Sequence, residues 1–149
     1  MVPEPFLPLA DVPATEELIL AASPMMYVKL CLQGTECPAL IDSGASGNFI
    51  SEGFVRQLNL RVRDLTQPCD IRAANGELMP CKHCAIVRAR LGELPFSLTL
   101  RVVPTDLRVI LGYPFLRFSD PEIYWRDRVM RITKGERVFN VPMGTNTPH

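Results

Sequence analysis

The sequence predicts an all-β domain with two short helices. Apolar and polar residues alternate along several short segments, which is the period of strands buried on one face. Turn signals separate these segments. The clearest is Asn75-Gly76, which supplies the two positive φ angles of a type I′ hairpin turn. Apolar residues at helical spacing are confined to two short stretches, so strands dominate the predicted fold.

The chain divides into three regions. Residues 1–23 carry four prolines and no clear period, so we expect a Pro-rich linker or arm there. The composition of this segment, acidic and Pro-rich, is unlike that of a secretory signal. Residues 24–140 contain the predicted strands and form the domain. Residues 141–149 are predicted to be a flexible tail.

Four hairpins are predicted in chain order. In the first, Gly34-Thr35 turns the chain after an alternating segment, residues 28–32. Pro38-Ala39-Leu40-Ile41 then returns as a continuous apolar run, which is typical of a fully buried strand. The other three hairpins join residues 69–73 to 77–85, 87–91 to 96–102, and 122–125 to 129–132.

The two predicted helices are short and have recognisable ends. Ser51 suits the N-cap of the first, whose apolar face is Phe54, Val55 and Leu58. Pro114 suits the first position of the second helix, because proline lacks the N–H that would be unpaired there. Asp120-Pro121 ends this helix, because the residue before a proline avoids the helical conformation.

The composition favours a single globular domain and argues against charged partners. The chain has 149 residues, of which 47% are hydrophobic, enough for a sizeable core. Sixteen basic and 16 acidic residues cancel, so we expect this domain to bind neither nucleic acid nor a membrane surface. The apolar stretches are far shorter than the roughly 20 residues of a membrane helix.

The five cysteines are predicted to be free thiols. An odd number without a secretion signal favours a reducing compartment, so we expect an intracellular, cytoplasmic protein. The segment Cys81-Lys82-His83-Cys84 raises the question of zinc. Its two cysteines would point to opposite faces of a strand, and no second Cys/His pair follows at zinc-finger distance. We therefore expect no metal and no cofactor.

One carboxylate stands where the buried strand ends. Asp42 follows the apolar run directly and precedes Ser43, Gly44 and Ala45. A carboxylate held at the end of a buried strand needs a partner, a hydrogen-bond cage or a function. Taken alone, Asp-Ser-Gly is also common in ordinary turns. The preceding strand, and the order of the elements that follow, favour a catalytic acid.

Peptide hydrolysis by carboxylates alone requires two of them, one ionised and one protonated. The chain has no second Asp-Ser/Thr-Gly, so the second acid must come from another copy related by a two-fold axis. In such a site, we expect Ser43 to hydrogen-bond across the axis and Gly44 to approach the carboxylate with its backbone. Ala45 leaves room for a peptide. Ala74, Asn75 and Gly76 are predicted to form the tip of a flap over the substrate.

These segments resemble the retropepsin family, the dimeric aspartic proteases of retroviruses and LTR retrotransposons. The likeness is closer to the gypsy-type branch and its domesticated vertebrate Gag-Pol-derived relatives. It covers most of residues 25–133, in the family's order. The resembling segments are Ala39 to Ser51, Ala74 to Glu77, Ile110 to Leu116, and Ile123 to Arg126.

The resemblance implies a closed β-barrel that works as a homodimer, with one half-site per chain. Asp42 becomes the catalytic acid, and Ile110-Leu111-Gly112 packs behind it. Retroviral members often carry an acid and an arginine that form an ion pair where this chain has Ser46 and Tyr113. Dimer cohesion is therefore expected to rest on other contacts.

The function expected is that of an aspartic endopeptidase, active as a homodimer, that hydrolyses peptide bonds in a Gag-Pol-type polyprotein. Its partners would be a second copy of itself and the peptide substrate. The alternative is a catalytically silent, domesticated retropepsin fold that serves as a dimerisation or peptide-binding module.

Overall fold

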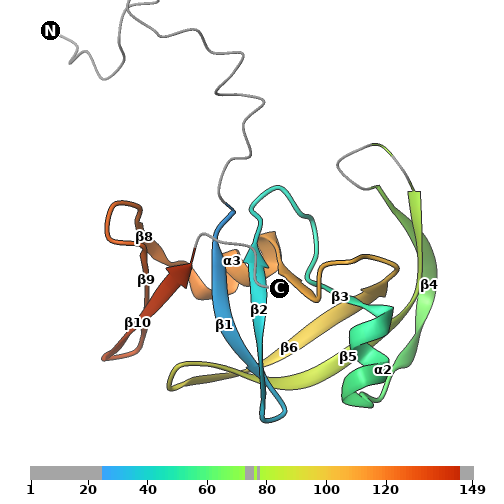
Figure 1. The fold of residues 1–149 in the computed structure, drawn as a ribbon, viewed down its shortest axis with the longest axis horizontal. Coiled ribbons are helices and arrows are strands. Elements are labelled where there is room, and N and C mark those ends of the chain that lie inside the picture. The colour runs from blue at the N-terminus through green and yellow to red at the C-terminus, as the bar shows by residue number, and fades with distance from the viewer. Residues whose placement is uncertain (1–24, 73–75, 77, 145–149) are drawn as a thin grey trace, which may run out of the picture.

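The computed structural model describes residues 25–72, 76 and 78–144, and it confirms an all-β domain with two short helices (Figure 1). The helices are α2 (Glu52–Leu58) and α3 (Tyr113–Ser119). The strands are β1 (Tyr27–Leu32), β2 (Thr35–Ile41), β3 (Phe49–Ser51), β4 (Arg63–Arg72), β5 (Leu78–Leu91), β6 (Leu94–Val103), β7 (Val109–Leu111), β8 (Glu122–Tyr124), β9 (Val129–Lys134) and β10 (Arg137–Gly144).

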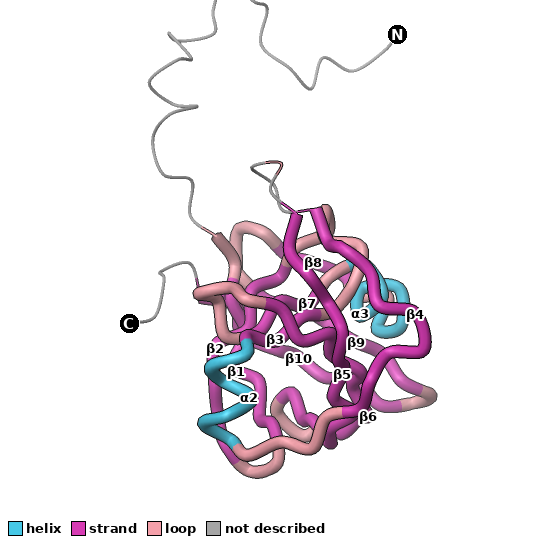
Figure 2. The backbone as a smooth tube through the Cα atoms, turned by 90° about the vertical axis from the view of Figure 1, so that its right-hand side faces the viewer, coloured by secondary structure: helices cyan, strands magenta, loops and turns pink. Residues whose placement is uncertain are grey.

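Six of the strands close into a barrel. Their order is β5-β6-β3-β7-β2-β1, and β1 pairs with β5 through Cys31 and Leu32 to complete the ring. Strand β4 extends the sheet beyond β5, while β10, β9 and β8 continue it from β1. Figure 2 shows the strands wrapped around a common interior, with the two helices on the outside. Closure pairs the strand edges that an open sheet would expose.

All four predicted hairpins are present among the paired strands. The first turn lies one residue earlier than predicted, because Gln33 and Gly34 are the residues with positive φ, at 48° and 89°. The β4–β5 hairpin is paired as far as Arg72 and Leu78. Its predicted Asn75-Gly76 turn lies outside the described residues, except for Gly76, whose φ is 90°.

The C-terminal prediction was wrong in part. Residues 141–144, expected in a flexible tail, belong to β10, which pairs with both β9 and β1. Val141 and Met143 alternate inward and are buried in the core, which explains why the strand extends this far. A fifth hairpin, β9–β10, turns at Gly135 with a φ of 62° and was not predicted.

The helices begin and end nearly where the sequence indicated. The Ser51 hydroxyl accepts a hydrogen bond of 3.0 Å from the Phe54 N–H, as an N-cap does. Helix α3 starts at Tyr113, one residue before the predicted Pro114, and ends at Asp120 in the left-handed conformation. No helix in the described ranges is long and apolar enough to cross a membrane.

Candidate active site

Asp42 is positioned by a parallel strand pairing, which the alternation of apolar and polar residues did not predict. Strand β2 runs beside β7, with Ile41 opposite Leu111. The Asp42 N–H continues this ladder by donating a hydrogen bond of 3.0 Å to the Leu111 carbonyl. This bond fixes the backbone of Asp42 at the end of β2. Leu111 lies behind Asp42, as the resemblance implied.

The residues after Asp42 form a tight turn around its carboxylate. The Gly44 N–H donates a hydrogen bond of 3.0 Å to Asp42 Oδ1, and the Ala45 N–H donates one of 3.1 Å to the Asp42 carbonyl. A Cβ on Gly44 would lie 3.3 Å from Oδ1, so glycine gives the backbone its close approach to the acid. Ser43 is exposed. The structure thus gathers all four predicted turn residues in one loop.

This loop is fastened to the start of α3. The Tyr113 N–H donates a hydrogen bond of 2.8 Å to the Ala45 carbonyl, and the Gly112 N–H donates one of 2.9 Å to Asn48 Oδ1. A Cβ on Gly112 would overlap the Gly47 carbonyl and would lie 2.6 Å from the Ala45 carbonyl. The resemblance placed Gly112 behind the acid, but sequence reasoning did not predict that it fastens the loop, and it assigned Asn48 no role of its own.

The Asp42 carboxylate carries no cation partner among residues 25–72, 76 and 78–144. The ion pairs found there join His83 to Asp64 and Arg137 to Glu93. Asp42 is half-buried, and its side-chain hydrogen bond comes from a backbone N–H. A carboxylate without a counter-charge remains free to share a proton with a second acid.

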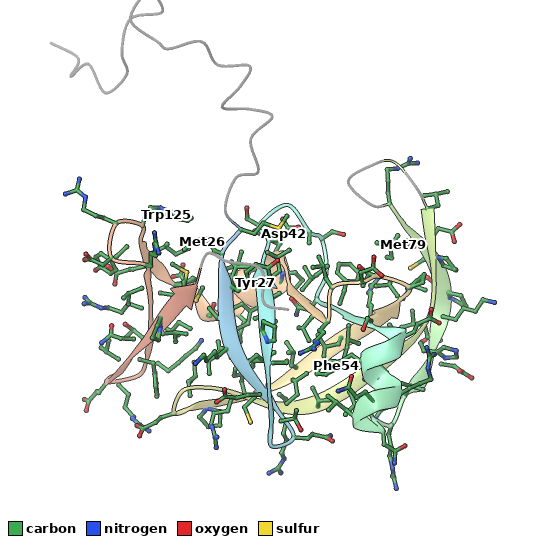
Figure 3. All side chains as sticks on the ribbon, viewed as in Figure 1. Met26, Tyr27, Asp42, Phe54, Met79 and Trp125 are labelled. Atoms are coloured by element: carbon green, nitrogen blue, oxygen red, sulfur yellow. The ribbon has the colours of Figure 1, made fainter. Side chains whose placement is uncertain are left out.

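A small apolar cluster joins the Asp42 loop, through Ala45, to the β4–β5 hairpin. It contains buried Phe49, Cys81 and Val103, with half-buried side chains packed against them. These half-buried residues are Ala45, Leu65, Cys69, Ile71, Met79 and Ile110. Figure 3 places Met79 on the hairpin strands, beside the part of the molecule that carries Asp42. This cluster therefore connects the acid's loop with the strands that lead to the predicted flap.

The remaining predicted residues are only partly described. Ala74 and Asn75 lie outside the described residues, whereas the Gly76 carbonyl accepts a hydrogen bond of 3.2 Å from Arg72 Nη1. No group of three or more His, Cys, Asp or Glu side chains that could hold a metal occurs in the part of the chain that the structure describes. Cys81 is buried and Cys84 is half-buried.

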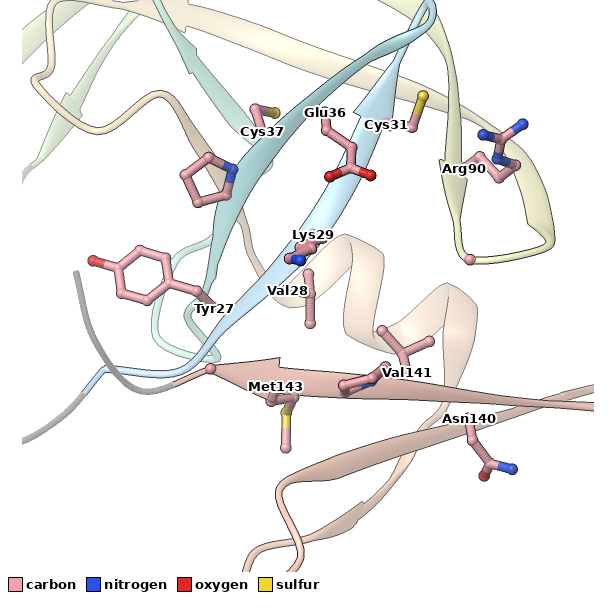
Figure 4. A pocket seen from close by; sticks show the side chains of 14 residues that line it. Tyr27, Val28, Lys29, Cys31, Glu36, Cys37, Arg90, Asn140, Val141 and Met143 are labelled. Carbon is pink, nitrogen blue, oxygen red and sulfur yellow. The ribbon is translucent and has the colours of Figure 1, made fainter. Parts of the chain in front are cut away.

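One large groove of the described structure lies away from the acid. This groove of about 800 Å³ lies between β1, β2 and β10 (Figure 4). Its lining includes Tyr27, Cys37 and Met143, and none of the residues of the Asp42 turn.

Comparison with known proteins supports this description. Residues 38–137, about two thirds of the chain, match the family described as the PEG10/RTL1 protease domain. DNA damage-inducible protein 1 of Kluyveromyces lactis is 26% identical over 121 residues, which cover 77% of this chain and 28% of that protein. The chain thus spans little more than a quarter of that relative.

Two solved structures share the fold. The retroviral protease-like domain of Ddi1 from Leishmania major superposes with a TM-score of 0.63 at 16% identity, covering 82% of this chain and 95% of that one. EIAV protease, complexed with the inhibitor HBY-793, gives 0.57 at 18% identity, covering 70% and 95%. The chain therefore belongs to the PEG10/RTL1 protease-domain family and has the retropepsin-like fold, a closed barrel with two helices.

Proposed function

We propose that this chain is an aspartic endopeptidase that acts as a homodimer, with one Asp42 from each subunit. The observation that carries the proposal is the setting of Asp42. It is fixed by the Leu111 carbonyl and the Gly44 N–H, and it has no cation partner among the described residues. A rigid carboxylate of this kind provides half of a two-acid site.

The chemistry follows from bringing two such acids together. Carboxyls about 3 Å apart cannot both be ionised, so the pair holds one proton. The ionised Asp42 takes a proton from a water molecule, whose oxygen attacks the peptide carbonyl carbon. The protonated Asp42 of the other subunit gives its proton to the carbonyl oxygen. Ser43 and Gly44 complete the turn that holds each carboxylate in place.

The dimer face proposed here is apolar. Of the six large apolar side chains that are more than half exposed among the described residues, three are proposed for this face: Met25 at 51%, Tyr113 at 56% and Trp125 at 67%. Tyr113 follows directly on the residue that fastens the Asp42 loop, and Figure 3 shows Met26, Asp42 and Trp125 along one edge of the molecule. A second copy that covers this edge would bury these side chains and bring its own acid to the first.

The substrate class proposed is an extended peptide with apolar residues at the cleavage site, within a Gag-Pol-type polyprotein. The half-buried apolar side chains from Ala45 to Met79 support this choice, because in this proposal they lie next to the scissile bond. Ala74, Asn75 and Gly76 are proposed as the flap that covers the peptide. A reducing, intracellular location, the cytoplasm, is also proposed. The five free cysteines of the described chain are consistent with it.

Cleavage of a peptide library, read by mass spectrometry, tests the proposal. Wild type is compared with Asp42→Asn, which keeps the size of the side chain and removes the acid. Asp64→Asn is the matched control, because Asp64 is 89% exposed and pairs only with His83. We expect wild type and Asp64→Asn to cleave the same peptides and Asp42→Asn to cleave none. Equal cleavage by all three proteins would refute the proposal.

A second function is favoured by one observation. The groove of about 800 Å³ lies on strands β1, β2 and β10, away from Asp42, and could hold a peptide in a non-catalytic dimerisation or peptide-binding module. Sedimentation that shows a dimer, together with no cleavage by wild type in the same library, would favour this module over the protease.

A further inference from the structure

Two cysteines face each other across the β4–β5 hairpin. Cys69 and Cys81 are direct partners in the antiparallel ladder, and the register shift of this pair lies between Asp64 and Cys69. Side chains of directly opposed residues project from the same face of a sheet. Directly opposed residues of an antiparallel pair generally have Cα atoms roughly 4.5–5.5 Å apart, within the range of about 4.4–6.8 Å that a disulfide requires. The strand pairing of Cys69 with Cys81 is therefore compatible with a disulfide.

The two thiols differ in access to solvent. Cys81 is 0% exposed, and burial raises the pKa of its thiol, with the nearby Cys69 as a smaller contribution in the same direction. Cys69 is half-buried, and Arg101 Nη1 donates a hydrogen bond of 3.4 Å to its sulfur. A cavity of about 150 Å³ opens at the pair, lined by residues 68–70 and 80–82. A small oxidant that enters this cavity meets Cys69 first.

We propose that Cys69 and Cys81 form an oxidisable dithiol that closes to a disulfide when hydrogen peroxide enters the cavity. The Cys69 sulfur attacks one peroxide oxygen, the O–O bond breaks, and one water leaves, so that Cys69 becomes a sulfenic acid. The Cys81 sulfur then attacks the Cys69 sulfur, the S–O bond breaks, and the departing hydroxyl takes the Cys81 proton as a second water. Two thiols lose two electrons and hydrogen peroxide gains them.

The location of this pair gives the bond a consequence. Both cysteines belong to the apolar cluster that includes Phe49 and Val103, on the strands that lead to the proposed flap. A disulfide there would tie β4 to β5 and restrict the hairpin. The effect on peptide cleavage rests on the proposed function, whereas formation of the bond does not.

Tryptic digestion of the unreduced chain separates the relevant thiols. Cleavage after Arg63, Arg72, Lys82 and Arg88 places Cys69 in peptide 64–72, Cys81 in 73–82 and Cys84 in 83–88. The folded chain is treated with hydrogen peroxide, its free thiols are alkylated, and the digest is examined by mass spectrometry. We expect peptide 64–72 joined to 73–82, two hydrogens lighter than the sum of the two, and separated again by dithiothreitol.

Variants make the assignment specific. Cys69→Ser and Cys81→Ser should lose the linked peptide, whereas Cys84→Ser, which removes the next thiol along β5, should keep it at the wild-type yield. In Cys81→Ser, dimedone should label Cys69 as its sulfenic acid, provided that circular dichroism shows the wild-type fold. The proposal would be overturned if peptide 64–72 were joined to 83–88 instead. It would also be overturned if Cys69 and Cys81 were both alkylated after peroxide treatment while Cys31 is oxidised. A linked peptide formed by a chain that cleaves no peptide would count against the proposed protease alone, and cleavage unchanged by the bond would count against its proposed effect on the hairpin.

Discussion

Replacing Gly112 with alanine is expected to destabilise the domain strongly. The added Cβ would overlap the Gly47 carbonyl and lie 2.6 Å from the Ala45 carbonyl, whereas ordinary contact begins at 3.4 Å. The Ala45 carbonyl would have to retreat by about 0.8 Å, and overpacking of this kind costs about 1–3 kcal/mol.

The displacement also strains hydrogen bonds. The bonds from Gly112 to Asn48 and from Tyr113 to Ala45 would both lengthen, at about 0.5–1.5 kcal/mol each. The total is about 2–6 kcal/mol, a large share of the roughly 5–15 kcal/mol that stabilises a domain.

Urea unfolding followed by far-ultraviolet circular dichroism measures this loss. For a slope of about 2 kcal/mol per molar, within the usual range of about 1–3, the midpoint should fall by about 1–3 M. Gly53→Ala is the matched control, because Gly53 is in helix α2 and a Cβ there meets nothing within 4 Å. That variant should gain up to about 1 kcal/mol. A Gly112→Ala midpoint equal to wild type would refute the account of how the Asp42 loop is held.

Two further substitutions test the described structure. Ser51→Ala should cost about 1 kcal/mol in the same unfolding assay because the Phe54 N–H loses its cap, and an unchanged midpoint would contradict this. Burial raises the pKa of Cys37 to about 11 from an ordinary 9.0, with Cys31 adding to the rise and Arg108 opposing it. The unfolded thiol ionises first, so stability should be fully present below about pH 9 and decline by about 2–3 kcal/mol as the pH rises to 11. Cys37→Ala should remove this decline. If the free energy of unfolding of wild type and of the variant fell in parallel with pH, the reasoning would be wrong.

The sequence predicted the local features of this fold but few of the pairings between segments that lie far apart in the chain. Hairpins follow from alternation and from glycines such as Gly92, because their determinants lie within a few residues of each other. The parallel pairs β2–β7 and β3–β6 join segments dozens of residues apart, and no local pattern records them. The end of β10 was missed because Pro142 suggested a tail, yet a proline is tolerated in a strand where its nitrogen is not needed as a donor.

The candidate site shows the same division. Asp42 and its turn could be predicted, because an apolar run that ends in Asp-Ser-Gly is a local pattern. The fastening of that turn by Asn48 and Gly112 could not, because it spans 64 residues and depends on the fold. The cross-strand pairing of Cys69 with Cys81 depends on a register shift within the hairpin, which alternation alone does not predict.

The central claim, that two chains share one site, is tested most directly by mixing wild type with Asp42→Asn. The wild-type concentration is held constant, at a level where sedimentation shows dimers, and peptide cleavage is followed as the variant is added. Mixed dimers hold one acid, so random pairing predicts activity of about one half at equal amounts and about one quarter at a threefold excess. Activity that stays constant at every ratio would contradict a shared site.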